Sequence, residues 1–262
     1  MSKKIQPVKY DPPGTFREVV AHPGGYNRVI EKAIIMEHRF AFVFWMKWKE
    51  ALMSRGWLDQ SAPTLVTIDW HRDLAPPNRR QKARLEKLDP SNLTAVASHV
   101  WKQFDQTNDG HILCAAWLNL IGDVILLKHS ARPLRDIFID RHGNEHHILE
   151  FREYDQFEKL LIHRDDRNIF LDIDLDYFIH GKGNVFYPGT FKPYSESEIQ
   201  EIIDHQHPAF DYLLSRMDGL TIAQEPAYCG GIAHSCRIMK VVNNQLFDDH
   251  NNWKHLAANT NL

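Results

Sequence analysis

The chain alternates short apolar runs with helix-like segments, and several of these runs end at acidic or histidine residues. Such a run is typical of a strand that is covered on both faces. Strands that alternate with helices form a mainly parallel sheet with helices on both faces. The sequence therefore predicts an α/β fold, a three-layer α/β/α sandwich whose functional residues gather at the carboxyl ends of the strands. The expected strands are residues 33–36, 64–68, 169–173 and 220–223.

The segments between these runs carry the spacing of helices. Ser91 or Asn92 can cap one of them, and Ser195 with Glu198 predicts a capping box at the start of another. Residues 137–150 instead hold two apolar runs around a polar turn, which predicts a β-hairpin inserted in the α/β chain. The expected helices are residues 43–55, 93–104, 113–127 and 197–217, the last interrupted near Pro208.

The composition excludes several classes of protein. With 262 residues, 43% of them hydrophobic, the chain can bury a substantial core, and we expect one domain over residues 1–262. The 31 basic and 34 acidic residues give a net charge of -3, so nothing indicates nucleic acid or an anionic membrane as a partner. The longest apolar run, residues 40–46, is far shorter than the roughly 20 residues of a membrane helix. Because the N-terminus lacks a secretory signal and the three cysteines are scattered, we expect a cytoplasmic protein.

Two predicted strands end in alternating acidic and histidine residues. Side chains two positions apart face the same way along an extended chain and can converge on one point. Grouped carboxylates raise one another's pKa values and lose hydration on burial, and divalent cations remove both costs. The sequence therefore predicts a site for two cations, whose formal charge four aspartates neutralise. The residues are Asp69, His71 and Asp73 after the first strand, and Asp172, Asp174 and Asp176 after the second.

An interpretation without metal stays open. The aspartates can be solvated strand ends, or they can pair with arginines such as Arg72 and Arg164. His38 follows another strand and can supply a further imidazole, although a single histidine beside an apolar run is more often a packed or surface residue. Three further histidines surround the predicted hairpin, where polar residues are expected without a metal site: His142, His146 and His147.

In this order the residues resemble the ureohydrolase branch of the arginase-deacetylase fold. That family binds two manganese ions through a histidine after one strand, an Asp-x-His-x-Asp after the next and an Asp-x-Asp after a later one. The resemblance implies a metal-dependent hydrolase of linear amidines with two Mn²⁺, bridged by Asp69 and Asp172. Oxygen-rich ligation with only two imidazoles also favours manganese over zinc. The implied ligands are His38, Asp69, His71, Asp73, Asp172 and Asp174.

The resemblance also implies catalytic roles. Glu225 matches the glutamate that holds the substrate guanidinium, although by itself it can equally be an exposed acid at a strand end. Asp73 would move a proton to the leaving amine. His111 is the nearest counterpart of a mobile histidine that relays protons in arginases, while helix capping by Asn108 or Asp109 explains its segment equally well.

The sequence departs from arginases in two places. Their Gly-Gly-Asp-His-Ser is replaced by Met-Glu-His-Arg at residues 36–39, and the polar loop that holds the α-groups of free arginine is not visible after Asp73. The closer resemblance is to a divergent subgroup with Leu-Asp-Ile-Asp-Leu-Asp-Tyr-Phe, here residues 171–178, which includes the peptide arginases of ribosomal natural-product pathways. It implies that arginine side chains of a precursor peptide become ornithine, with release of urea.

Two other functions remain open. A zinc-dependent, deacetylase-like amidohydrolase of the same fold would normally spare the positions of His38 and Asp73 as ligands. A non-catalytic, metal-stabilised binding protein would have no role for Glu225. The sequence leaves undetermined the oligomeric state, the precursor peptide, the metal used in the cell and the role of Asp176.

Overall fold

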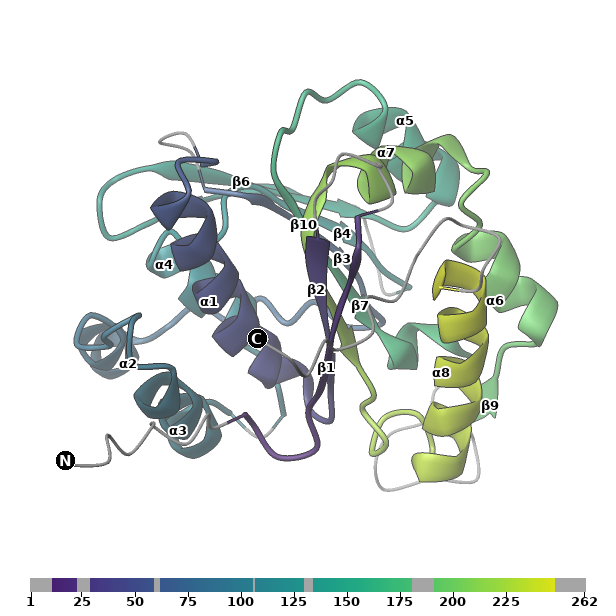
Figure 1. Cartoon of the computed structure of the whole chain (residues 1–262), viewed down its shortest axis with the longest axis horizontal. Coiled ribbons are helices and arrows are strands. Elements are labelled where there is room, and N and C mark those ends of the chain that lie inside the picture. The colour runs from purple at the N-terminus through teal and green to yellow at the C-terminus, as the bar shows by residue number, and fades with distance from the viewer. Residues whose placement is uncertain are drawn as a thin grey trace, which may run out of the picture.

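The computed structural model describes residues 11–22, 29–58, 62–105, 107–129, 134–180 and 191–247. Its centre is a sheet of eight strands in the order β1-β2-β10-β7-β3-β4-β6-β5 (Figure 1). Neighbouring strands from β2 to β6 are parallel, whereas β1 and β5 lie antiparallel at the two edges. The strands are β1 (Phe16–Ala21), β2 (Val29–Ile35), β3 (Thr64–Ile68), β4 (Val124–Leu127), β5 (Arg135–Ile139), β6 (Glu145–Phe151), β7 (Ile169–Asp174) and β10 (Met217–Ala223).

Helices cover both faces of this sheet, and the predicted three-layer α/β/α architecture is confirmed (Figure 1). None of the helices in the described ranges is long and apolar enough to cross a membrane. One face carries α1 (Ala41–Ser54), α2 (Arg79–Leu85), α3 (Leu93–Gln103) and α4 (His111–Trp117), and the other carries α5 (Tyr154–Leu161), α6 (Glu196–Ile202), α7 (Pro208–Arg216) and α8 (Ile232–Phe247). Shorter elements are the 3-10 helices η1 (His38–Phe40) and η2 (Leu175–Phe178) and the strand pair β8 (Ile179–His180) and β9 (Lys192–Pro193).

The two faces of the sheet have separate apolar cores because side chains alternate along each strand. In β3, Leu65 packs into the core beneath α1, α3 and α4, while Val66 and Ile68 pack into the core beneath α5, α7 and α8. All five residues of β3 are buried. Charged side chains are costly along a strand that is buried on both faces, so we expect functional charges near the ends of such strands.

Most of the predicted elements are present, but the helix predicted at 113–127 is wrong. Helix α4 ends at Trp117, and β4 begins at Val124. The chain leaves the helix through Asn119, which has a φ of 56°. The amide of Asn119 donates to the carbonyl of Ala116, and that of Leu120 to the carbonyl of Ala115, which together form a Schellman C-cap. The largely apolar composition of residues 113–127 had concealed this stop, since a buried strand and a buried helix share that composition.

The remaining differences are smaller. The helix predicted at 197–217 is two helices, α6 and α7, and Met217 already belongs to β10. Both predicted caps are present: Asn92 accepts from the amide of Ala95, and Ser195 forms a capping box with Glu198. The predicted hairpin is β5 and β6, which extends the main sheet because β6 pairs with β4. The strand β1, the helices α2, α5 and α8 and the short elements η1, η2, β8 and β9 had no sequence prediction.

Helix α1 lies close to the sheet because β10 has no side chain at Gly219. A Cβ at this position would overlap the six-membered ring of Trp48. Trp48 is buried and donates from Nε1 to Oε2 of Glu31 at 2.9 Å, so its ring is not free to move away. The position therefore requires glycine for packing.

We expect Gly219→Ala to lower the free energy of unfolding by about 1–3 kcal/mol, the usual cost of overpacking a well-packed core. Urea denaturation followed by circular dichroism measures this change. In a Trp48→Leu background the ring is absent, so the same substitution should cost much less. An equal cost in both backgrounds would show that the ring does not set the requirement.

Candidate metal centre and active site

Apart from His111, the predicted site residues lie in or just after four strands that are neighbours in the sheet, in the order β2, β10, β7 and β3. These strands are parallel, so their carboxyl ends lie at one edge. His38 follows β2, Asp69 to Asp73 follow β3, Asp172 and Asp174 end β7, and Glu225 follows β10. The fold thus brings together residues that are up to 187 positions apart.

His38 lies at the centre of the cluster, and its imidazole is fully buried. Its Nε2 is 2.6 Å from Oδ2 of Asp172. Its Nδ1 is 3.0 Å from Oδ2 of Asp73, 3.1 Å from Oδ2 of Asp174 and 3.4 Å from Oδ2 of Asp69. Burial by itself lowers the pKa of His38, but the charges of Asp172 and Asp174 overcome it and raise this pKa well above its usual value. Four carboxylates therefore surround one imidazole.

Asp172 is the best supported of these carboxylates. Oδ2 accepts from Thr67 Oγ1 at 2.8 Å, and Oδ1 accepts from Thr221 Oγ1. Both threonines lie directly beside Asp172 on the neighbouring strands β3 and β10. Burial raises the pKa of Asp172, but the positive charge and hydrogen bond of His38, with the bond from Thr221, bring it below the usual value. Asp172 is therefore held as an anion.

Asp69 and Asp174 have the opposite balance. Burial and the charges of Asp73 and Asp174 raise the pKa of Asp69 well above its usual value. Burial and the charge of Asp176 raise the pKa of Asp174 to about 7. Oδ2 of Asp69 is buried and accepts no hydrogen bond. These are carboxylates without enough positive charge around them, which is the state that a cation relieves.

His71 and Asp176 connect the two acidic segments. His71 is half exposed, and its Nδ1 lies 2.8 Å from Oδ2 of Asp176. Asp176 Oδ1 accepts from the amide of Trp70 at 3.2 Å, and the Asp176 amide donates to Oδ1 of Asp174 at 3.1 Å. Burial lowers the pKa of His71, but the hydrogen bond and charge of Asp176 raise it to about 9. Asp176 therefore orients His71 and ties the loop after β3 to the end of β7.

The donor atoms fit a metal centre. Three groups have ligand atoms within 4.8 Å of one another: His38 with Asp69 and Asp174, Asp69 with His71 and Asp176, and His38 with Asp73 and His111. Asp69 and His38 each belong to two of the groups. Asp172 belongs to none of them, because its side chain faces His38 and the two threonines. The six predicted ligands lie together, and their action as ligands stays a prediction.

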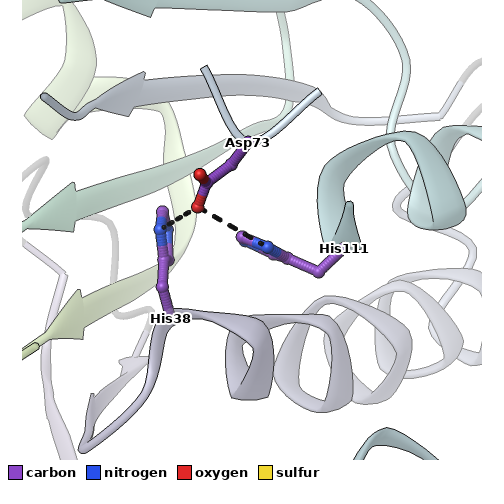
Figure 2. A group of neighbouring side chains, drawn as sticks. All are labelled: His38, Asp73 and His111. Atoms are coloured by element: carbon purple, nitrogen blue, oxygen red, sulfur yellow. Dashed lines mark hydrogen bonds and ion pairs between the residues drawn. The ribbon is translucent and has the colours of Figure 1, made fainter. Parts of the chain in front are cut away.

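His111 is the first residue of α4 and is buried, whereas a mobile loop residue was expected. Figure 2 shows Asp73 between His38 and His111, with Nδ1 of His111 3.9 Å from Oδ2 of Asp73. The His111 ring lies 4.4 Å from that of His38 and stacks on Trp45 at 5.5 Å. Burial and the charge of His38 lower its pKa to about 3, so this imidazole is neutral. Its role as a proton relay stays a prediction.

The alternative of helix capping by Asn108 or Asp109 is wrong. The N-cap of α4 is Gly110, and no side chain caps the helix. Instead, the carbonyl of Asn108 accepts from Nδ1 of His111 at 3.0 Å, and its side chain turns towards Glu225. No role at the site was predicted for Asn108. The sequence feature that could have indicated one is the Asn-Asp-Gly turn, which suits a left-handed backbone.

Glu225 is buried and points into the cluster, so it is not an exposed strand-end acid. Its Oε1 accepts from the amide of His38 and from Nδ2 of Asn108, the latter at 2.5 Å. Burial and the charge of Asp174 raise its pKa well above the usual value. A cation beside this carboxylate would return it to the ionised form.

Three site residues have left-handed backbone conformations. The φ angles are 47° at Asp73, 60° at Asn108 and 38° at Glu225. In the described ranges the only other residue besides glycine with a positive φ is Asn119. Such conformations cost of order 1–3 kcal/mol each and concentrate at functional sites. The strained backbone therefore gathers around the same cluster as the carboxylates.

The arginines named as possible partners of the aspartates lie elsewhere. Arg72 donates to Glu150, which also pairs with Lys128. Arg164 pairs with Asp123 and Asp166 beside a cavity of about 510 Å³. That cavity is lined by the start of β3 and the residue before β7, so it lies at the opposite end of the strands from the cluster. A salt-bridge network with these arginines is therefore wrong.

The histidines around the hairpin form no metal site in the part of the chain that the structure describes. His146 Nε2 lies 3.4 Å from Oδ2 of Asp140, and His147 pairs with Asp123. His142 Nε2 accepts from Arg141. These contacts lie within the hairpin, apart from the one to Asp123.

No protein-family model matches the sequence, and no curated protein does. Among solved structures, an arginase of Helicobacter pylori is similar over 81% of this chain and 73% of its own. The identity is 13% and the TM-score is 0.38. We therefore base the proposed function on the residues of the site.

We expect Asp69→Asn to raise the melting temperature of the metal-free protein, because it removes one unpaired charge from a crowded group of carboxylates. The same change should abolish the stabilisation by Mn²⁺. For the unmodified chain that stabilisation is about 2.7 kcal/mol when the ion is present at 100 times its Kd. Scanning calorimetry of chelator-treated protein, with and without Mn²⁺, measures both effects.

The matched control is the exposed Asp165→Asn, which should change neither measurement. A lower melting temperature for metal-free Asp69→Asn, together with an undiminished response to Mn²⁺, would contradict the assignment of Asp69.

Proposed function

We propose that the protein is a binuclear manganese hydrolase that converts arginine side chains of a precursor peptide to ornithine and releases urea. The observation that carries this proposal is the position of Glu225. A buried carboxylate lies in direct contact with the backbone of His38, at the edge of a cluster of metal-competent side chains. Such an arrangement offers an anionic contact to a cationic substrate beside a site for divalent cations.

The donor set suits the ions that the proposal requires. Carboxylate oxygens outnumber imidazoles, which favours manganese over zinc. Two such ions would supply a hydroxide nucleophile at neutral pH. The residues that would hold them are His38, Asp69, His71, Asp73, Asp172 and Asp174.

The remaining chemistry belongs to the side chains of this chain. Glu225 binds the guanidinium by charge-assisted hydrogen bonds and so fixes its central carbon. After hydroxide adds to that carbon, the bond from it to Nε breaks. Asp73 takes the proton of the added hydroxyl and transfers it to Nε, which leaves as the amine of ornithine, and the carbon leaves in urea. His111 lies beside Asp73, with its Nδ1 3.9 Å from Oδ2 of Asp73, and is the side chain that would relay protons to and from Asp73.

The choice of a peptide substrate rests on the segment after Asp73. Its sequence is Leu-Ala-Pro-Pro at residues 74–77, which offers no side-chain donor or acceptor for charged α-groups. Free arginine would bring an ammonium and a carboxylate to this segment, and leaving both without partners is unfavourable. A peptide presents neutral amides at the same place. Aromatic side chains near the site, Trp70 and Tyr228 among them, can line the path of such a peptide.

We expect the manganese-loaded protein to release urea from a peptide that contains arginine and to process free arginine poorly or not at all. A colorimetric urea assay at equal substrate concentrations tests this, with mass spectrometry to locate ornithine in the peptide. A strong preference for free arginine would contradict the peptide assignment. Release of acetate from acetylated amines, with one zinc per chain and no urea, would instead favour the deacetylase-like alternative.

We expect Glu225→Gln to keep its metal and to lose at least tenfold in kcat/KM. The variant lacks the charge that faces the guanidinium, and a hydrogen bond to a charged group is worth about 1.5–3 kcal/mol. Metal content by mass spectrometry and urea kinetics separate the two effects. The exposed Glu86→Gln is the control and should behave as the unmodified chain. Unchanged kinetics in Glu225→Gln would show that this glutamate does not contact the substrate.

A further inference from the structure

Asn108 has an unusual position for an asparagine without an assigned role. Its side chain is only 5% exposed, and its backbone is left-handed with a φ of 60°. It touches both residues proposed to act on the substrate side: its Nδ2 donates to Glu225, and its carbonyl accepts from His111. A change at Asn108 would therefore reach Glu225 and His111 at once.

The contacts of Glu225 leave one of its oxygens free for a ligand. Oε1 accepts from the amide of His38 and from Nδ2 of Asn108. A carboxylate oxygen has about two lone-pair sites, so these two donors occupy Oε1. Among the described residues no side chain or amide donates to Oε2, so Oε2 is the atom that remains for a guanidinium. The hydrogen bond from Asn108 thereby fixes the rotation of the carboxylate.

A single carboxylate oxygen cannot satisfy a buried guanidinium, which carries five N–H donors in a planar fork. Each donor left without an acceptor costs free energy when it is desolvated. The side chain of Asn108 holds the missing acceptor. Its Oδ1 is buried and has no hydrogen-bond partner, and within the amide group it lies next to the Nδ2 that contacts Glu225.

The orientation of the Asn108 amide follows from its neighbour. With Glu225 ionised, as it would be beside bound cations, an amide turned over would place Oδ1 against Oε1 of Glu225, and two acceptors would meet without a hydrogen between them. Nδ2 must therefore face Glu225, and Oδ1 is the atom left unpartnered. A buried carbonyl oxygen without a donor is unfavourable in the free protein, and a ligand N–H would remove that cost.

We propose that Asn108 binds the substrate guanidinium directly, with Oδ1 accepting one N–H while Nδ2 holds Glu225 in position for another. This inference rests on the proposed function in that the ligand is an arginine side chain. It assigns to the site a second, neutral acceptor beside the charged one. An ammonium group lacks the planar fork that could reach both acceptors together, so the pair favours arginine over lysine.

The test is the binding of N-acetylarginine amide, a capped arginine, to manganese-loaded protein by isothermal titration calorimetry. Asn108→Gly removes the amide but tolerates the left-handed backbone. The matched control is Asn119→Gly, the same change at the other left-handed asparagine, which lines the cavity at the opposite end of the strands. We expect Kd to rise at least tenfold in Asn108→Gly and to stay within twofold in Asn119→Gly. Manganese content and melting temperature should match between the two variants.

A second variant and a rescue separate binding from a structural role. Asn108→Ser, with a side chain too short to bridge Glu225 and a ligand, should lose affinity in the same way. Acetamide, which carries the missing amide group, should restore part of the affinity of Asn108→Gly and leave Asn119→Gly unchanged. If both Asn108 variants unfold or lose manganese, or if Asn108→Gly binds within twofold of the unmodified chain, the inference is overturned.

The same experiment separates this inference from the proposed function. If the unmodified chain binds the capped arginine but never releases urea, the proposed reaction fails, while the ratio of Kd values still decides the role of Asn108. If the unmodified chain releases urea and Asn108→Gly binds normally, only the role of Asn108 fails. If the unmodified chain does not bind the capped arginine at all, both are overturned.

Discussion

The whole site depends on the electrostatic cost of placing four buried carboxylates around the imidazole of His38. Burial and mutual repulsion both penalise the ionised forms, and one imidazolium offsets only part of this. The cost is unevenly distributed: Asp172 is held as an anion, whereas the pKa values of Asp69 and Asp174 are raised. The arginines Arg72 and Arg164 pair elsewhere and cannot supply the missing charge. Divalent cations are the counter-charge that fits these donor atoms.

The order of the strands makes this arrangement possible. Because β10 and β3 flank β7 in register, Thr221 and Thr67 both lie beside Asp172 and donate hydroxyls to it. The carboxylate is thereby oriented by the sheet itself, before any ion binds. Second partners of this kind fix the geometry of metal ligands. The apolar cores on both faces of the sheet keep these strands in register and so hold these side chains in place.

The sequence predicted the structure best where a single local pattern determines the element or the position of a side chain. β3 has the predicted bounds, and the acidic and histidine residues after β3 and β7 lie together because parallel strands end at one edge. It was least informative where a contact joins distant segments. Nothing local to Asn108 indicates its hydrogen bond to Glu225, 117 residues away, and Asp176 receives its partner His71 from another strand end. The wrong helix over 113–127 has a local cause, since apolar composition does not separate a buried helix from a buried strand.

The backbone of the site gives a reason why the cluster needs so large a scaffold. Asn119 adopts a left-handed conformation at a helix end, where asparagine is often found and the strain is small. Asp73 and Glu225 adopt the same conformation with side chains that must also face a crowded set of charges. Glutamate is rarely found in that state, so at Glu225 the surrounding packing must impose it. A sheet buried on both faces resists deformation, because its close-packed side chains leave no space for movement. The strained backbone and the crowded carboxylates therefore lie at the same edge of the sheet. A bound cation there would reduce the repulsion between the carboxylates but would leave the backbone strain unchanged.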